Sequence, residues 1–289
     1  MPEIQALTEG SPKPVFSAAS LLFVPGSRPD RFAKAKAAGA GLTVIDLEDA
    51  VPADEKDSAR KAALDHIRGE PAMGWAIRIN AVTTADGIRD LAALTASETM
   101  PPYLLVPMVE AATEVEIVAS VLGDDCPALI PLIETPRGLR HAHEIAGVAK
   151  VAAMMFGGGD FSAELGVELA WEPLLAARQQ FVLACSEHAL PAIDVPFIQL
   201  DNEAGLVEEC ARAEAIGFDA KAAIHPRQIA AIEEAFEPGD DAVNAAKEAL
   251  QAYEQAGERA IRHKGRMLEA PLVKKYRAVV ARKEGTQNA

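Results

Sequence analysis

Residues 42–48, Leu-Thr-Val-Ile-Asp-Leu-Glu, form a short and nearly continuous apolar run that ends in acidic residues. A segment rich in Ala, Lys and Arg, 54–68, follows this run and is long enough for a helix. Apolar runs of this kind are typical of strands buried on both faces, as in a parallel sheet covered by helices. Seven more of them occur along the chain, at 20–26, 75–80, 103–108, 128–134, 151–156, 191–195 and 219–225.

The eight strand candidates, each followed by a helix candidate, predict an α/β fold, a closed TIM (β/α)8 barrel. An open, doubly wound sheet stays the alternative, because a count of strands does not show that the ring closes. The predicted barrel spans 17–238. It follows a polar, Pro-bearing leader, 1–16, which we expect to be flexible.

The pattern changes at Gly239, where we expect a C-terminal helical extension, 239–289. A long amphipathic helix is predicted over 240–262 and a second helix over 270–282. Between Arg259 and Lys283 the chain carries nine Lys or Arg residues and one acid, Glu269. We expect this cationic segment to act in oligomerisation and as a lid over an active site, most simply that of a neighbouring subunit. A helix pair that only pads its own barrel is the alternative.

Composition and charge exclude several classes of protein. The chain has 289 residues, 49% of them hydrophobic, and a formal net charge of −15, which disfavours binding to nucleic acid. Since no run of about 20 apolar residues occurs, no membrane span is expected. The three cysteines form no close pair, and the N-terminal segment has acidic residues and no apolar core of a signal peptide. We therefore expect a cytoplasmic protein.

Two carboxylates lie at the ends of buried strands of the predicted barrel, Glu134 at the end of 128–134 and Asp160 after Gly157-Gly158-Gly159. Active sites of such barrels lie at the C-terminal ends of the strands. Oxygen ligands with no Cys or His nearby suit Mg²⁺, with Mn²⁺ as a substitute, so the sequence predicts a metal site. The glycines would let backbone amides approach a bound anion. The alternative is that Glu134 and Asp160 only cap helices.

A cation, Arg78, lies within the apolar run 75–80 and should point into the barrel mouth. There it could grip a carboxylate or stabilise an enolate oxygen, or it could serve as a structural partner of Asp46, Glu48 or Asp49. Glu48 is a candidate to hold a metal-bound water, and Asp49 a candidate to orient Arg78. We also expect Lys221 to reach the mouth from the run 219–225.

Several motifs together resemble the citrate lyase β-subunit-like proteins of the HpcH/HpaI aldolase family. The resemblance runs in order from about residue 20 to the end of the chain. The motifs are Leu-Phe-Val-Pro-Gly at 22–26, Val-Ile-Asp-Leu-Glu-Asp-Ala-Val at 44–51, Arg-Ile-Asn at 78–80, Pro-Leu-Ile-Glu-Thr at 131–135, Gly-Gly-Asp-Phe at 158–161 and Ala-Ile-His-Pro-Arg-Gln at 223–228.

The resemblance implies a TIM barrel with a C-terminal extension, trimeric or hexameric assembly and a Mg²⁺-dependent active site. It also implies reversible cleavage of a citryl-, malyl- or citramalyl-type 3-hydroxyacyl thioester, on CoA or an acyl carrier, into an acyl thioester and a 2-oxo acid. It assigns substrate contact to Arg78 and metal ligation to Glu134 and Asp160. Pro25, Gly26 and Arg28 fall where the family brings in the thioester, and we expect Glu134, Gly158 and Gly159 to contact substrate as well.

One position departs from the family, because many members have Pro-Lys where this chain has Pro107-Met108. A cation is therefore missing from the rim, and the acyl group or its carrier could differ. The implied chemistry is a retro-Claisen cleavage, in which Arg78 stabilises a thioester enolate. A malyl-CoA thioesterase or malate synthase-like activity is one alternative. A non-catalytic subunit of a larger lyase complex is another.

Overall fold

Eight parallel strands close into a barrel in the order of the chain, which confirms the predicted TIM fold. The structure is a computed structural model and describes residues 16–70 and 74–287. The strands of the barrel are β1 (Ser20–Pro25), β2 (Leu42–Asp46), β3 (Trp75–Arg78), β4 (Tyr103–Val106), β5 (Ala128–Ile133), β6 (Met154–Phe156), β7 (Ala192–Asp194) and β8 (Ala220–Ala223). β8 pairs with β1 through the register Leu21↔Ala222, so the ring is closed and the open sheet is excluded.

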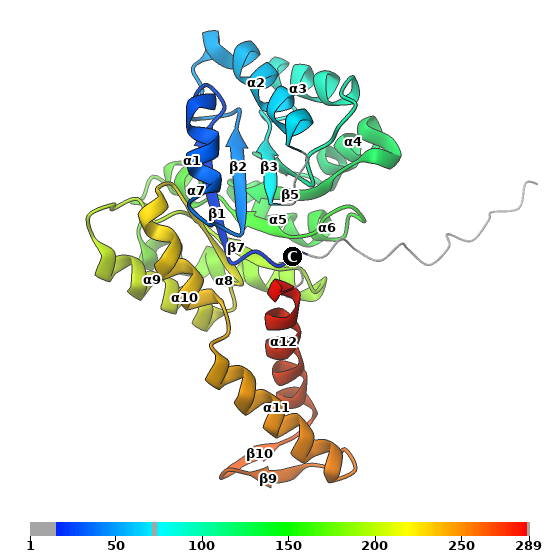
Figure 1. Cartoon of the computed structure of the whole chain (residues 1–289), viewed down its shortest axis with the longest axis vertical. Helices are drawn as coiled ribbons and strands as arrows, with labels where there is room; N and C mark the ends of the chain where they lie inside the picture. The colour runs from blue at the N-terminus through cyan, green and yellow to red at the C-terminus, as the bar shows by residue number, and fades with distance from the viewer. Residues whose placement is uncertain (1–15, 71–73, 288–289) are drawn as a thin grey trace, which may run out of the picture.

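Helices surround this ring on the outside (Figure 1). They are α1 (Phe32–Lys36), α2 (Lys56–Gly69), α3 (Ala85–Thr95), α4 (Ala112–Leu122), α5 (Pro136–Arg140), α6 (Ala142–Ala146), α7 (Gly158–Leu165), α8 (Trp171–Glu187), α9 (Glu203–Ile216) and α10 (Ile229–Phe236). Gly217 ends α9 with a φ of 103°, a left-handed conformation that glycine adopts without strain.

Strand residues alternate between the inside of the barrel and the layer beneath the helices. One buried cluster fills the inside and includes Val44, Leu105 and Ile193. A larger cluster lies between strands and helices and includes Ile45 and Ile77. This alternation decides which polar strand residues can reach the mouth.

Lys221 is on the outward face of β8, so the prediction that it reaches the mouth is wrong. Its neighbours Ala220 and Ala222 belong to the inner cluster, and a period of two therefore turns Lys221 outward. The fully buried ammonium contacts Asp194 Oδ2 at 2.6 Å and Glu209 Oε1 at 2.7 Å. Lys221 belongs to a buried charge cluster, in which Arg178 contacts the other oxygen of Asp194 at 2.9 Å.

The C-terminal arm, which we define as residues 239–287, consists of α11 (Asp240–Gln255), a hairpin of β9 (Ile261–His263) and β10 (Arg266–Leu268), and α12 (Ala270–Gln287). The prediction of one helix over 240–262 missed this hairpin. Lys264 and Gly265 form its turn with φ values of 44° and 81°. Since both turn residues have positive φ, the turn is of the kind that favours a tight two-residue hairpin.

The arm packs chiefly on itself, through a small core of Ala249, Tyr253, Leu268 and Val273, and Figure 1 shows it projecting away from the barrel. It is attached at the end of the barrel where the strands begin. There the C-terminal end of α10, with Glu233 and Glu237, lines a hollow with Leu42 and Tyr103, the first residues of β2 and β4.

Most of the predicted leader, 1–15, lies outside the described residues. Its last residue, Phe16, is buried and stacks edge-on against Tyr103, with ring centroids 5.6 Å apart. In the part of the chain that the structure describes, no helix combines the length and apolar character that a bilayer span requires.

Candidate active site

A cavity of about 450 Å³ opens at the C-terminal ends of the barrel strands. Its acidic half has four carboxylates and one cation. Asp46 ends β2 and Asp49 lies in the loop after it, Glu134 directly follows β5, Asp160 is on α7, and Arg78 ends β3. The other half is apolar and comes from β1, from the loops that follow β7 and β8, and from the segment between α7 and α8. The apolar lining residues include Phe23, Pro25, Leu169, Val195, Pro196, Ile198 and Ile224.

Arg78 is the central cation of the acidic half. Its Nε and Nη2 contact the two oxygens of Asp46, each at 2.7 Å, in a bidentate pair. Both side chains are nearly buried, at 11% and 2% exposure. Asp46 also accepts hydrogen bonds from the backbone N–H of Glu48 and of Ala50, at 2.9 and 3.2 Å. The same carboxylate therefore fixes the guanidinium and folds the loop after β2.

Two further acids close on Arg78 from that loop. Nη1 lies 2.6 Å from Glu48 Oε2 and 3.4 Å from Asp49 Oδ2. Three carboxylates raise the pKa of Arg78 in spite of its burial, so it stays charged. Glu48 behaves differently, because burial outweighs the attraction of Arg78 and raises its pKa to about 8. The predicted pairing of Arg78 with the acids of β2 is thus present, and all of its partners lie at the mouth.

Glu134 lies at the end of β5 and is 3% exposed. Its Oε2 accepts a hydrogen bond of 2.6 Å from the backbone N–H of Met108. Met108 has a φ of 54°, an uncommon conformation for a residue with a side chain, and such conformations concentrate at functional sites. Burial raises the pKa of Glu134 to about 7. Glu134 does not cap α5, whose N-cap is Thr135.

Asp160 lies in the first turn of α7 and not at its N-cap, which is Gly157. It is exposed at the cavity, and partial burial raises its pKa. It also raises the pKa of Glu134, so the two carboxylates repel one another. A divalent cation would relieve this repulsion. The capping alternative is therefore unsupported for both residues.

The donor set fits Mg²⁺. Glu134 and Asp160 offer hard carboxylate oxygens on one cavity, and one oxygen of Glu134 is left free by the Met108 contact. No cluster of three or more His, Cys, Asp or Glu side chains suited to a metal ion occurs among the described residues. Two protein ligands leave coordination places for water and substrate oxygens, which is the usual arrangement for Mg²⁺.

The remaining predicted site residues lie in different places. Pro25 and Gly159 line the cavity. Gly26 packs against β2, and its N–H donates to Asp46 O at 2.8 Å. Gly158 is buried, and a Cβ there would lie 3.2 Å from Val195 Cγ1. Arg28 is half-exposed and contacts Asp30 at 2.8 Å. The geometry thus brings Pro25 and Gly159 to the cavity but not Gly26, Gly158 or Arg28.

A model of the HpcH/HpaI aldolase/citrate lyase family matches residues 19–226, which include every strand of the barrel. This chain belongs to the HpcH/HpaI aldolase/citrate lyase family.

Its relatives in this family include named lyases. The mitochondrial citramalyl-CoA lyase of Homo sapiens is 31% identical over 286 residues, which cover 90% of this chain and 84% of the relative. The L-malyl-CoA/β-methylmalyl-CoA lyase of Cereibacter sphaeroides is 31% identical over 301 residues, which cover 91% of this chain and 93% of the relative. Among solved structures, protein CitE from Mycobacterium tuberculosis, in complex with magnesium, acetoacetate and coenzyme A, is 33% identical with a TM-score of 0.77, covering 93% of this chain and 98% of that one.

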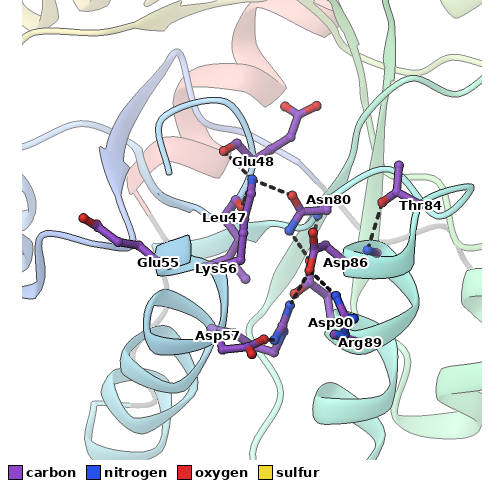
Figure 2. Close-up of polar contacts among 12 residues, drawn as sticks. Leu47, Glu48, Glu55, Lys56, Asp57, Asn80, Thr84, Asp86, Arg89 and Asp90 are labelled. Carbon is purple, nitrogen blue, oxygen red and sulfur yellow. Dashed lines mark hydrogen bonds and ion pairs between the residues drawn. The ribbon is translucent and has the colours of Figure 1, made fainter. Parts of the chain in front are cut away.

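In this member of the HpcH/HpaI family, sequence reasoning missed Lys56, the first residue of α2. Its Nζ donates to Asn80 Oδ1 and to the backbone of the loop that carries Glu48 (Figure 2). It also missed the apolar half of the cavity and the backbone N–H of Met108. No local signal marks these residues, because their roles depend on contacts between strands far apart in the sequence.

Proposed function

We propose that this protein is a Mg²⁺-dependent carbon–carbon lyase. It reversibly cleaves a 3-hydroxyacyl thioester of the citryl-, malyl- or citramalyl-CoA type into an acyl thioester and a 2-oxo acid. The observation that carries this proposal is the position of Arg78, Glu134 and Asp160 on one cavity at the mouth of the barrel. The relatives named as citramalyl-CoA and malyl-CoA lyases support it.

In the proposed reaction Glu134 and Asp160 hold Mg²⁺. When bound, the ion lowers the pKa of the substrate hydroxyl and so favours its deprotonation. Breakage of the adjacent C–C bond leaves an electron pair on the acyl thioester as an enolate. Arg78 stabilises the enolate oxygen, because its Nη2 carries a second N–H that makes no hydrogen bond within the described residues. The hydroxyl carbon becomes the carbonyl carbon of the 2-oxo acid. One proton, equal in number to the one released from the hydroxyl, is taken up at the enolate carbon and completes the acyl thioester.

The other site residues support this arrangement. Asp49 and Glu48 orient Arg78 through the contacts at Nη1, and Glu48 would also hold a water on the bound metal. Gly159 and Pro25 line the cavity and would lie along the path of the thioester, and Gly158, buried against Val195, would hold the backbone next to Gly159. Gly26 is buried against β2 and would hold the backbone that leads to Arg28, and Arg28, at the surface, would meet the carrier phosphates.

The C-terminal arm is proposed to cover the mouth of a neighbouring subunit in a homo-oligomer, a trimer or hexamer. Its attachment at the far end of its own barrel supports a neighbour as the partner. A chain ending at Phe236 should lose the oligomer and most of its kcat, because the enolate would then be open to water. An oligomeric, fully active truncated chain with unchanged thioester KM would show that the arm has no such role. Reduced, buried cysteines fit a cytoplasmic location.

The test of the activity is incubation of the purified protein with citryl-, malyl- and citramalyl-CoA and Mg²⁺, with products identified by mass spectrometry. An acyl-CoA together with a 2-oxo acid supports the lyase. Free CoA with the intact hydroxy acid would instead identify a malyl-CoA thioesterase. Formation of a free hydroxy acid and CoA from added acyl-CoA and 2-oxo acid, in a second incubation, would identify a malate synthase-like enzyme. Absence of turnover in a protein that co-purifies with an acyl carrier would identify a subunit of a larger lyase complex.

A further inference from the structure

Lys56 places its ammonium group directly behind the acidic loop of the active site. Nζ donates to Leu47 O at 2.8 Å, to Glu48 O at 2.7 Å and to Asn80 Oδ1 at 2.7 Å. An ammonium has three N–H groups, and here each has one acceptor. One side chain thus ties the start of α2 to the segments that follow β2 and β3.

The Asn80 end of this connection is itself fixed. Asp90 Oδ2 on α3 accepts hydrogen bonds from the backbone N–H and from Nδ2 of Asn80, at 2.8 and 2.7 Å. Its other oxygen accepts from Nε of Arg60 on α2. Asp90 is 1% exposed and Asn80 5%. Lys56 is therefore held on a rigid base formed by two helices and a strand end (Figure 2).

The front of the same loop faces Arg78. Figure 2 shows the Glu48 side chain pointing away from Lys56. Glu48 and the next residue, Asp49, contact Nη1 of Arg78. The backbone at 47–48 thus lies between two cations. Lys56 binds its carbonyl oxygens on one side, and the side chains of Glu48 and Asp49 contact Arg78 on the other.

The local sequence does not account for a lysine at this position. Lys56 is the first residue of α2, and a cation is unfavourable at a helix N-terminus. Acids surround it in the sequence at Asp54, Glu55 and Asp57, yet within the described residues its ammonium makes no ion pair with any of them. Lys56 is thus unfavourable for the helix terminus but makes contacts to the loop. Departures from local preference of this kind are expected near a functional site.

We infer that Lys56 is a positioning residue of the active site: it fixes the backbone at Leu47–Glu48, so that Glu48 and Asp49 hold the guanidinium of Arg78 where the enolate oxygen forms. The kinetic consequence rests on the proposed lyase function, whereas the structural consequence does not. A misplacement of catalytic groups by about 1 Å costs about 10²-fold in rate.

The test compares Lys56→Met, which keeps the length and apolar stem, with Lys61→Met. Lys61 is also on α2, but it is exposed, and its ammonium pairs with Asp65. Hydrogen exchange should rise in segment 46–52 of Lys56→Met and stay unchanged in 128–134. We expect kcat to fall by about 10²-fold with KM within about threefold, and Lys61→Met to match the wild type. The loss should be smaller when Glu48→Gln is already present, because both changes act through one loop.

A second variant separates positioning from loss of folding. Lys56→Cys treated with 2-bromoethylamine regains an ammonium at nearly the original distance, and the three native cysteines are buried. Alkylation should restore both kcat and the slow exchange of 46–52.

Three results would overturn the inference. The first is hydrogen exchange in 46–52 of Lys56→Met equal to that of Lys61→Met. The second is an increase in exchange that extends equally to 128–134. The third is a failure of alkylation to restore either kcat or the slow exchange of 46–52. Absence of turnover in the wild type would refute the lyase proposal alone, and the exchange data would still decide the role of Lys56.

Discussion

The side chain of Glu134 occupies the space that a Cβ at Gly157 would fill. A methyl group at that position would overlap Cγ, Cδ and Oε1 of Glu134. The two residues follow neighbouring strands, and the N–H of Gly157 donates to Ile133 O at 3.0 Å. The place of the proposed metal-binding carboxylate is thus set by the absence of a side chain on the next strand.

Gly157→Ala should therefore displace Glu134 and weaken Mg²⁺ binding by about tenfold or more. Isothermal titration with Mg²⁺ measures this directly. The matched control is Gly69→Ala, which adds the same methyl group where no atom lies within 4 Å. Equal Mg²⁺ affinity in the two variants would show that the position of Glu134 does not matter for the ion.

Arg78→Lys should lower kcat by about 10² or more, because a single ammonium cannot contact both oxygens of Asp46, the acids of the loop and a developing enolate together. Steady-state kinetics on the thioester that is turned over measures the loss. Arg89→Lys makes the same chemical change at an exposed position of α3 and serves as the control. Near-normal kinetics in Arg78→Lys would assign this residue to structural pairing alone.

Mg²⁺ affinity should rise with pH. Burial raises the pKa of Glu134 to about 7, and the pKa of Asp160 is also raised. Protons and Mg²⁺ compete for these oxygens, so binding is weak where the carboxyls are protonated and levels off above the raised pKa. Titrations between about pH 6 and about pH 8 should show stronger binding at the higher pH and release of protons. An affinity that does not change over this range would contradict the raised pKa.

Substrates that release a monocarboxylic 2-oxo acid should be preferred. Among the described residues that line the cavity, Arg78 is the one cation, and carboxylates already hold it. A second substrate carboxylate, as in citryl-CoA, would meet acids or an apolar wall. We expect kcat/KM for citramalyl- or malyl-CoA to exceed that for citryl-CoA by about tenfold or more. Ile198→Lys, which adds a cation at the exposed rim, should reduce the difference in kcat/KM between these substrates. A preference of the wild type for citryl-CoA would contradict the prediction.

The sequence was sufficient for the barrel and for three residues at its mouth, Arg78, Glu134 and Asp160, because both depend on short-range patterns. Buried parallel strands have apolar runs, and the carboxyl ends of such strands meet at one edge, so Arg78, Glu134 and Asp160 could be placed together from their positions after strands. Family motifs then supplied the chemistry, which spacing alone does not define.

The misses have physical causes. Lys221 was misplaced because the face of a strand changes with a shift of one residue, and β8 starts at Ala220. The hairpin in the arm was missed because its strands have only three residues each and lie between two helical patterns. Lys56 was missed because its acceptors are mostly backbone carbonyls, which every residue has.

The attachment of the arm at the opposite end of the barrel has a consequence for mixtures of defective chains. Under the proposed assembly the arm covers the mouth of a neighbouring subunit, so each working site combines two polypeptides. A chain with Arg78→Lys keeps its arm, and a chain that ends at Phe236 keeps an intact mouth. Each alone should be inactive, yet unfolding and refolding them together should restore activity by complementation between subunits. The recovered activity should rise and then fall as the mixing ratio passes through an optimum, and it should disappear on dilution below the dissociation constant of the oligomer.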